Sequence, residues 1–380
     1  MKFRTTGSTL LGLMRGLSLK KDALPAHLEL ADDGTLSFTV REPMYWLRRL
    51  AAVEAIEPGS MNMDRHLLTN LARFGKDILT VSATTERIEV AADGLNVGAK
   101  NTAPSDLPDG PRMPFEMVAA KASEFSKALK KVLYAVDHDK YSVRPALQDV
   151  YFDSRDGKLA LVATDGVRLA VASTSIPWET PVLVWAGTLT MFRPDDETIT
   201  LGITKSPSGE PQTLHIGNGR EALWIHLVQA EFVNYRRILD DPIEAQAKVT
   251  LSADECLLKL RRIFLSPPPT RQSIGHLRGR AHRGDPSCFL TVSEADASGA
   301  TLSVERRDEY TARVRVGATA SGKARVCVNA SYLLDLLRVH KGEELTLSIR
   351  EPYAPILVET PETRHLLLPL RTYEDQRLAA

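Results

Sequence analysis

The segment from Leu147 to Ser173 reads LQDVYFDSRDGKLALVATDGVRLAVAS, with three short apolar runs separated by two Asp-Gly pairs. An Asp-Gly pair between alternating apolar residues is a strong hairpin signal, because glycine accepts the positive φ angle that a tight turn requires. We therefore predict three antiparallel strands at Val150–Ser154, Lys158–Thr164 and Arg168–Ser173. The turn signals alone are also compatible with a surface meander that has no chemical role.

A pattern of helix, strands, helix and strands recurs along the chain. Apolar residues at helical spacing follow Ser8, Ser123 and Ser252, and serine is a favourable N-cap. A glycine turn and a strand follow each of these predicted helices. Repetition at long period indicates duplicated structural units.

Second helices are predicted in the first and third units only. They begin near Met63, in MDRHLLTNL, and near Asn329, in NASYLLDLL. The middle unit has only WAGTLTMF from Trp185 onward, so we expect a short or missing helix there.

The repeat predicts an α+β fold with three similar domains. Domain boundaries favour polar stretches that contain proline, and we place the domains at residues 1–110, 111–245 and 246–380. The basic stretch from Ser266 to Gly284 is interpreted as a loop-like insertion or a disordered surface loop.

Four motifs, in order, resemble those of the bacterial sliding clamps, the β subunits of DNA polymerase III. Ala163–Ala170, ATDGVRLA, is similar to the family's ATDGHRLA, and Glu231–Leu239, EFVNYRRIL, resembles the end of its second domain. Asn329–Leu337, NASYLLDLL, resembles a helix of its third domain, and Leu367–Arg371, LLPLR, resembles its C-terminal MPMR. The resemblance therefore extends along most of the chain.

The resemblance implies a closed ring made by a head-to-tail homodimer. Helices would line a central hole and antiparallel sheets would lie outside. The ring would encircle double-stranded DNA without reading its sequence and tether polymerase and clamp-loader peptides. We expect no enzymatic activity, cofactor or metal, and a cytoplasmic location away from membranes.

The resemblance also implies a partner-peptide pocket between the second and third domains. Its residues would be Leu147, Thr164, Gly166, Val167, Arg168, Leu169, Leu366, Leu368, Pro369, Leu370 and Arg371. Plain core packing is the alternative interpretation of the leucines. Three residues depart from the family pattern, because Val167 replaces histidine, and Val233 and Asp240 stand where proline is usual. The tail from Thr372 to Ala380 also runs past the usual terminus.

Basic residues near the predicted helices are candidates for contact with the DNA backbone. They are Arg15, Arg73, Lys127, Lys130, Lys131, Arg144, Lys259 and Arg262. Ordinary solvated helix faces are the alternative. Lys plus Arg and Asp plus Glu are equal at 48 each, which argues against a protein that grips DNA through many phosphate contacts. A ring could still retain DNA by topology.

Two other readings remain open. The departures favour a clamp-like paralogue, of phage, plasmid or regulatory type, with altered protein partners. The segment Gly317–Ala324, GATASGKA, nearly matches a phosphate-binding loop, which would suggest a nucleotide-dependent enzyme. The motif's final hydroxyl residue is missing and a strand follows it, so we predict a hairpin loop instead. The three cysteines have no zinc-site spacing.

Overall fold

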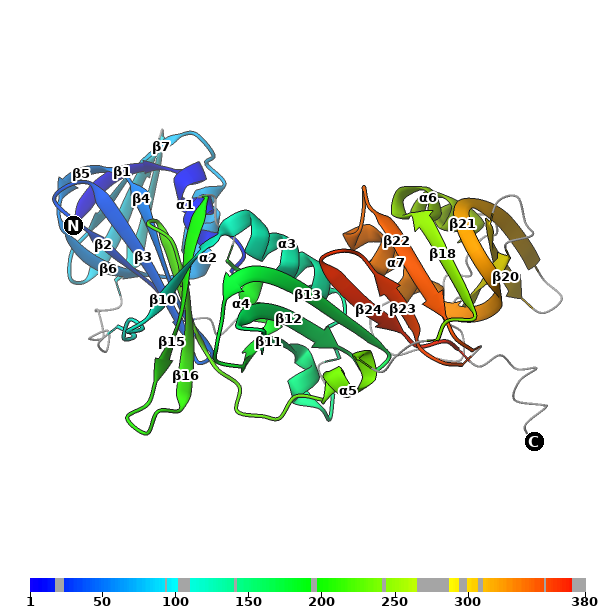
Figure 1. Cartoon of the computed structure of the whole chain (residues 1–380). Coiled ribbons are helices and arrows are strands. Elements are labelled where there is room, and N and C mark those ends of the chain that lie inside the picture. Colours follow the sequence, from blue (N-terminus) through cyan, green and yellow to red (C-terminus); the bar gives the residue numbers. More distant parts are fainter. Residues whose placement is uncertain are drawn as a thin grey trace. The chain divides into compact units, whose positions relative to one another are not determined.

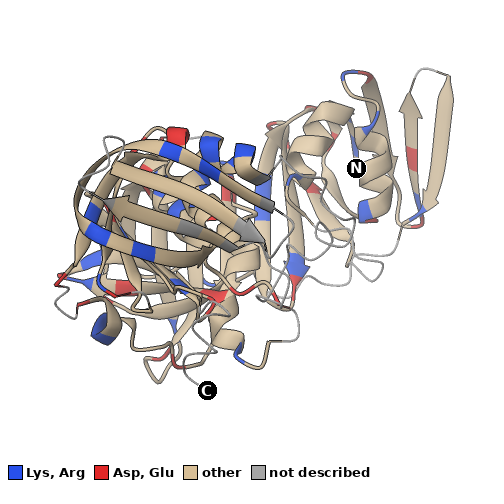
Figure 2. Cartoon of the chain, turned by 90° about the vertical axis from the view of Figure 1, so that its right-hand side faces the viewer, with Lys and Arg blue, Asp and Glu red and all other residues tan. Residues whose placement is uncertain are grey.

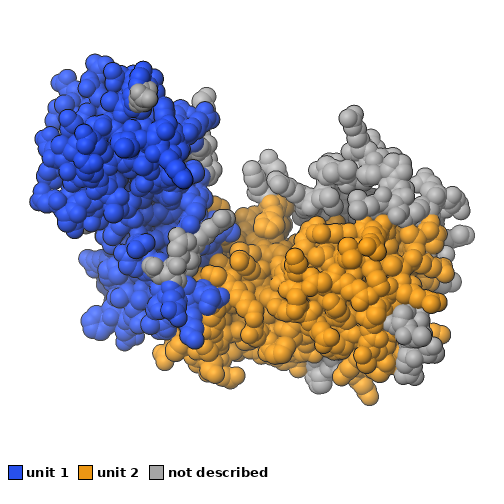
Figure 3. Space-filling view, turned by 90° about the horizontal axis from the view of Figure 1, so that it is seen from above, with its two compact units in different colours: residues 1–123, 187–228 blue, residues 124–186, 229–380 orange. Residues whose placement is uncertain are grey.

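The computed structural model describes residues 1–17, 24–92, 94–101, 110–139, 142–192, 197–240, 244–264, 287–293, 299–306, 310–351 and 353–370. The basic insertion 266–284, Arg371 and the tail 372–380 lie outside the described residues. The chain forms two compact units (Figure 3). Unit 1 comprises residues 1–123 and 187–228, and unit 2 comprises residues 124–186 and 229–380.

Unit 1 contains two antiparallel sheets and two paired helices. Its elements are β1 (Lys2–Thr6), α1 (Gly7–Met14), β2 (Ala26–Leu30), β3 (Thr35–Glu42), β4 (Tyr45–Ala52), β5 (Glu54–Glu57), β6 (Gly59–Met63), α2 (Arg65–Ala72), β7 (Ile78–Ala83), β8 (Arg87–Ala92), β9 (Leu95–Lys100), β10 (Met117–Lys121), β15 (Thr198–Lys205), β16 (Pro211–Gly217) and β17 (Glu221–His226). The strand orders are β5-β1-β7-β8-β9 and β10-β15-β16-β17-β4-β3-β2-β6.

Helix α1 begins two residues earlier than Ser8 predicts. The Thr6 side chain caps it by accepting a hydrogen bond from the Thr9 amide at 3.2 Å. The Ser8 amide instead donates to the Gly75 carbonyl at 2.6 Å, at the end of α2. Gly7 permits this close approach, because a Cβ atom there would lie 2.6 Å from the Gly75 nitrogen. The predicted helix start at Ser8 is therefore wrong by two residues.

Unit 2 is built on a single large antiparallel sheet (Figure 1). Its elements are α3 (Ala122–Leu133), which begins at the unit boundary, a 3₁₀ turn η1 (Pro145–Gln148), β11 (Asp149–Arg155), β12 (Lys158–Thr164), β13 (Arg168–Pro177), β14 (Val182–Trp185), α5 (Tyr235–Leu239), β18 (Ala247–Ser252), α6 (Ala253–Phe264), β19 (Ser287–Ser293), β20 (Gly299–Arg306), β21 (Tyr310–Asn329), α7 (Ala330–Val339), β22 (Glu344–Ile349), β23 (Ile356–Glu359) and β24 (Thr363–Leu367). The short helix α4 (Ala186–Leu189) leaves unit 2 after its first residue and continues in unit 1. The strand order is β14-β11-β12-β13-β24-β23-β22-β18-β21-β19-β20.

The three strands predicted around the two Asp-Gly pairs are confirmed as β11, β12 and β13. The first turn contains Asp156 and Gly157, both with positive φ, and Gly166 in the second turn has φ +88°. Helix α3 packs on this meander through Phe125, whose ring centroid lies 6.1 Å from that of Phe152 on β11. The hairpin chemistry of the sequence therefore fixes the local fold here.

The predicted second helices are also confirmed. Asp64 caps α2 and Asn329 caps α7, each through a side chain that accepts backbone N–H groups. Helix α4, in the middle of the chain, has only four residues, as the sequence predicts. Between β18 and α6, Ser252 Oγ accepts from the Glu255 amide at 3.5 Å, so this serine also begins a helix.

The predicted hairpin loop at Gly317–Ala324 is wrong, because these residues lie inside strand β21. This strand changes partner along its length, pairing first with β20, then with β18 and finally with β19. Every part of it therefore has a hydrogen-bonded neighbour, and the small residues Gly317, Ser321 and Gly322 do not interrupt the ladder.

Two sheets cross the predicted domain boundaries. The sheet of unit 1 joins β4 to β17 on either side of residue 110, and that of unit 2 joins β13 to β24 on either side of residue 245. The division into three domains remains a prediction. None of the helices among the described residues has the length and apolar character that a membrane span requires.

Candidate partner-peptide site

The turn between β12 and β13 is held by its own side chains. Thr164 Oγ1 donates to the Arg168 carbonyl at 2.6 Å and accepts from the Gly166 amide at 3.0 Å. Asp165 Oδ1 accepts from the amides of Val167 and Arg168, both at 2.9 Å. These bonds leave little conformational freedom, so the turn presents a fixed surface.

The C-terminal strand lies directly beside this turn. In the β13–β24 ladder, Arg168 is opposite Leu367 and Leu169 is opposite Leu366. Beyond the strand, the Leu368 amide donates to the Val167 carbonyl at 3.0 Å. The structure therefore brings together the two segments that the sequence predicts to share one site.

Arg168 anchors the β12–β13 turn to helix α7. Its Nη1 atom is 3.0 Å from Asp335 Oδ2 on α7, and its Nε atom is 2.9 Å from Asp165 Oδ2. The guanidinium carbon lies 4.4 Å from the ring centroid of Tyr332 and 5.2 Å from that of Tyr134. Contact with two aromatic rings together with two ion pairs suits arginine and not lysine. Arg168 is therefore a buried structural anchor of the site.

The predicted pocket residues divide into buried and accessible members. Leu147, Thr164, Arg168, Leu169 and Leu366 are buried. Leu169 and Leu366 belong to an apolar cluster that also contains Tyr235 and Leu239 of α5, so core packing accounts for these two leucines.

The accessible part of the site is small. Gly166 and Leu368 are exposed, and Val167, Pro369 and Leu370 are partly buried. Leu370 is held by its amide, which donates to the Cys327 carbonyl at 2.7 Å. Arg371, the last predicted member, lies outside the described residues. Any partner must therefore meet the site through these exposed backbone and apolar groups.

Two residues beside the turn enlarge this accessible surface. Val143 is 84% exposed and precedes Arg144, which is also exposed. The Arg144 guanidinium covers Gly166, since a Cβ atom added there would lie 3.2 Å from Nη1 and Nη2. Arg144, predicted to face DNA, is thus placed at the edge of the candidate peptide site.

Asp240, one of the departures from the family pattern, bridges two arginines. Its Oδ1 atom lies 3.2 Å from Arg155 Nη2 and 3.1 Å from Arg364 Nη1 on β24. Arg364 Nη2 also donates to the Leu239 carbonyl at 3.0 Å, at the end of α5. A proline here could not make these contacts, so this chain fastens α5 to the sheet in its own way.

The lysines predicted to face DNA from α3 have three different environments. Lys130 is exposed. Lys127 is exposed but lies 2.7 Å from the Glu362 carboxylate. Lys131 is buried at 4% exposure, and its Nζ lies 2.6 Å from Glu343 Oε1. The placement of Lys131 on an open face is therefore wrong, because the helical spacing brings it under α7 and not into solvent.

The remaining basic candidates are separated between the units. In unit 2, Lys259 pairs with Glu255 one helical turn away, and Arg262 is exposed. In unit 1, Arg73 is exposed at the end of α2, while Arg15 is partly buried at the end of α1. Lys, Arg, Asp and Glu are distributed over helices, strands and loops (Figure 2). Their contact with DNA remains a prediction.

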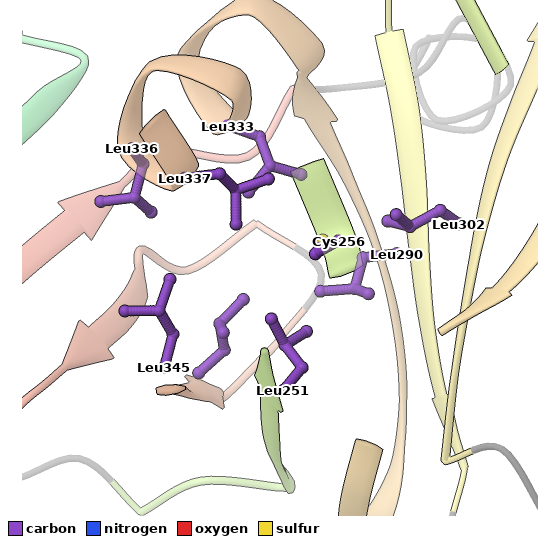
Figure 4. Close-up of a pocket in the computed structure, with 9 residues that line it drawn as sticks. Leu251, Cys256, Leu290, Leu302, Leu333, Leu336, Leu337 and Leu345 are labelled. Atoms are coloured by element: carbon purple, nitrogen blue, oxygen red, sulfur yellow. The ribbon is translucent and has the colours of Figure 1, made fainter. Parts of the chain in front are cut away.

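An apolar pocket lies away from the candidate site, inside the packing of α6, α7 and their sheet (Figure 4). It is lined by Leu251, Cys256, Leu290, Leu302, Leu333, Leu336, Leu337, Leu345 and Leu347. Burial raises the pKa of the Cys256 thiol to about 12. These residues belong to one hydrophobic core cluster, so the pocket is a gap in core packing.

The sequence did not indicate which side chains pack around Arg168. Tyr332 and Asp335 lie three residues apart in NASYLLDLL, a spacing that places both on one helix face. That spacing was an available signal. No spacing in the sequence indicates that Tyr134, His340 and His365 lie together, because only the fold brings them into contact.

Sequence comparison relates the chain to the β sliding clamp of Escherichia coli K12. The two are 24% identical over 366 residues, which cover 89% of each chain. No protein-family model matches the chain.

Comparison with solved structures gives matches over nearly the whole length. The DNA polymerase sliding clamp of Bacillus subtilis has a TM-score of 0.81 at 16% identity and covers 98% of this chain and 100% of its own. The β sliding clamp of C. crescentus has a TM-score of 0.80 at 21% identity, with 98% and 99% covered. The DNA polymerase III subunit β of Pseudomonas aeruginosa has a TM-score of 0.78 at 18% identity, with 98% and 100% covered.

These matches cover 98% of the chain. The protein has the fold of the bacterial β sliding clamps and is a divergent relative of them.

Proposed function

We propose that the protein is a DNA sliding clamp, a processivity factor that encircles duplex DNA and tethers partner proteins. Two copies would close head to tail into a ring of six similar domains, and each chain would contribute residues 1–110, 111–245 and 246–380. The interface would be heterologous and would close after two copies. The protein would have no catalytic activity and would act in the cytoplasm.

The observation that carries this proposal is the match of 98% of the chain to sliding clamps of several bacteria. A match of this extent includes both units, the first with its two sheets and the second with its single large sheet. The near-zero net charge is compatible with it, because a closed ring retains DNA by topology and needs only weak phosphate contacts.

Partner proteins would dock on the surface formed by the β12–β13 turn and the residues after β24. This surface offers exposed backbone at Gly166 and apolar side chains at Val167, Leu368 and Leu370. An extended peptide with a glutamine anchor and a leucine-phenylalanine end suits such a surface. Polymerase and clamp-loader subunits are the expected sources of the peptide.

A clamp-like paralogue with altered partners is the second candidate. Val167 cannot donate or accept through its side chain, whereas the family's histidine can. Arg144 covers Gly166, and Asp240 holds α5 through two arginines. These differences concentrate at the candidate peptide site, so altered specificity would be expressed there while the ring remained unchanged.

Mass in solution and retention on DNA test the proposal together. A closed ring has about twice the chain mass of 41.9 kDa and, once loaded, stays on circular duplex but slides off after the circle is cut. Griselimycin, with which the clamp of Bartonella birtlesii was crystallised, supplies a second probe beside the peptide. A monomer that does not remain on circular DNA after incubation with a clamp loader would contradict the proposal. A DNA-retaining dimer that ignores both probes would favour the paralogue.

A further inference from the structure

A chain of hydrogen-bonded side chains crosses the interior of unit 2 behind the candidate peptide site. Tyr134 Oη, directly after α3, is 2.9 Å from His365 Nδ1 on β24. His365 Nε2 is 2.8 Å from His340 Nε2, at the end of α7. His340 Nδ1 is 2.9 Å from Lys131 Nζ, back on α3. The hydrogen-bonded chain therefore runs from the residue after α3 through two imidazoles and returns to α3 at Lys131.

The two imidazoles are enclosed. His340 is 0% exposed and His365 is 1% exposed. Their Nε2 atoms can share only one proton at 2.8 Å, because two N–H groups would otherwise face each other. One ring must therefore accept at this contact, so the pair can carry at most one positive charge in the folded arrangement.

Charged and titratable groups surround the pair and its hydrogen-bonded neighbours. The groups that act on the histidines are Lys127 and Lys131 on α3 and Glu343 after α7. Asp165 and Arg168 at the β12–β13 turn and Asp335 on α7 act on Tyr134, and Glu362 before β24 acts on the two lysines. Burial lowers the pKa of both histidines, and for His365 the charge of His340 adds to the effect. Burial also lowers the pKa of Lys131, with Glu343 acting in the opposite direction. The neutral pair is thus matched to a cationic Lys131 and an anionic Glu343.

The same side chains touch the candidate peptide site at two points. The ring of Tyr134 lies 5.2 Å from the Arg168 guanidinium carbon, so it forms one side of the slot that holds Arg168. His365 immediately precedes Leu366 and is paired with Ala170 in the β13–β24 ladder. A shift of either ring would therefore move the turn or the strand that a partner peptide must contact.

We propose that the relay Lys131–His340–His365–Tyr134 positions the peptide site and makes partner binding sensitive to acid. The inference rests on the peptide-binding function proposed above. A proton added to the pair from solvent places a second cation 2.9 Å from Lys131 Nζ. Glu343 can compensate only one of these two charges. The repulsion separates α3 from α7 and β24, and the slot around Arg168 opens.

Peptide affinity measured against pH tests the relay in the full-length protein. The probe is a synthetic peptide with a glutamine anchor and a leucine-phenylalanine end. Its binding is measured by fluorescence anisotropy from pH 8 to pH 5. Wild-type affinity is expected to stay constant down to about pH 6.5 and to fall only at the acid end of the range, because burial lowers the pKa of both histidines. A difference of one unit between the pKa of the free and the peptide-bound protein corresponds to about a tenfold change in affinity. His340→Gln with His365→Gln should give a flat profile. His138→Gln is the matched control, because His138 is exposed in the same unit, and its profile should follow wild type.

Tyr134→Phe is a smaller change that tests the relay even where the double histidine variant does not fold. It removes only the hydroxyl that reaches His365 and keeps the ring beside Arg168, so affinity at pH 8 should remain while the pH dependence changes. Histidine ring resonances in NMR provide an independent readout, with two rings expected to titrate well below the exposed ones. A wild-type protein that binds with a flat profile, or two buried rings that titrate normally, would overturn the relay alone. Absence of peptide binding at pH 8 would overturn both the relay and the peptide-binding function.

Discussion

Arg168 in the β12–β13 turn and Asp335 on α7 are joined by an ion pair of 3.0 Å between Nη1 and Oδ2. The two residues are 167 positions apart in the chain, and both belong to motifs that resemble those of sliding clamps. Arg168 is 8% exposed, so this contact is shielded from solvent and fixes where the turn meets the helix.

Substitution of Arg168 by lysine should weaken the fold and the peptide site together. Lysine keeps the charge but cannot stack between Tyr134 and Tyr332 or reach both carboxylates. Loss of a hydrogen bond to a buried charged group typically costs about 1.5–3 kcal/mol. Chemical denaturation should show a decrease of that order, and peptide affinity should fall.

Asp335→Asn is the milder control for Arg168→Lys. It keeps the shape and leaves the Asp165 contact in place, so its effect on the unfolding free energy should be smaller. An Arg168→Lys variant as stable as wild type would show that the stacked arrangement contributes little.

The lysines of α3 should separate into two classes on mutation. Lys130→Glu, alone or with Lys127→Glu, should shorten retention on circular duplex, because it removes exposed positive charge from the helix. Each lost phosphate contact should also reduce the slope of log affinity against log salt by about 0.9. Lys131→Glu should chiefly destabilise the fold, since it places a carboxylate beside Glu343 in a buried site. Equal retention by wild type and the Lys127/Lys130 double variant would place these lysines away from DNA.

Acid should destabilise unit 1 through His215. Burial, aided by Arg48, lowers the pKa of His215 to about 4, whereas an unfolded histidine titrates near 6.5. Between these values the unfolded chain binds a proton that the folded chain does not, so the unfolding free energy falls as the pH drops from about 6.5 to 4. His215→Gln should lose less stability than wild type between pH 7 and pH 5 in parallel denaturation curves. Identical pH dependence in the two proteins would exclude this role.

Asp149 in unit 2 should give the unfolding free energy a pH dependence of the opposite sign. It is buried, and burial raises its pKa to about 7. The folded chain therefore holds a proton that the unfolded chain releases near pH 4, and stability is lost as the pH rises from about 4 to 7. Asp149→Asn keeps the shape without the charge. The unfolding free energy of Asp149→Asn minus that of wild type should be larger at pH 8 than at pH 5. A difference that does not change with pH would contradict the buried carboxyl.

The sequence predicts the parts of the fold whose signals are local. Asp156-Gly157 and Asp165-Gly166 mark turns through backbone chemistry, and Asn329 marks a helix start through its own side chain, which accepts from the Ser331 amide two residues on. Gly317–Ala324 was misread because a paired strand is decided by neighbours that are distant in sequence. The same limit explains Lys131, whose burial depends on His340 and Glu343 and not on its own helix.

The leucines of the candidate site provide the final prediction. Leu368 is 37% exposed beside Val167, whereas Leu169 is 6% exposed within a core cluster. Leu368→Asp should abolish peptide binding and leave the unfolding free energy and the solution mass almost unchanged. Leu169→Asp should instead unfold unit 2 or lower its stability by several kcal/mol, because it buries an unpaired charge.

The two variants together separate a binding surface from a core. Calorimetry with the peptide, run beside denaturation and mass measurements, distinguishes the outcomes. If Leu368→Asp bound the peptide as wild type does, the partner surface would lie elsewhere on the chain. If Leu368→Asp lost stability as severely as Leu169→Asp, both leucines would be core residues and the accessible surface would reduce to the Gly166 turn.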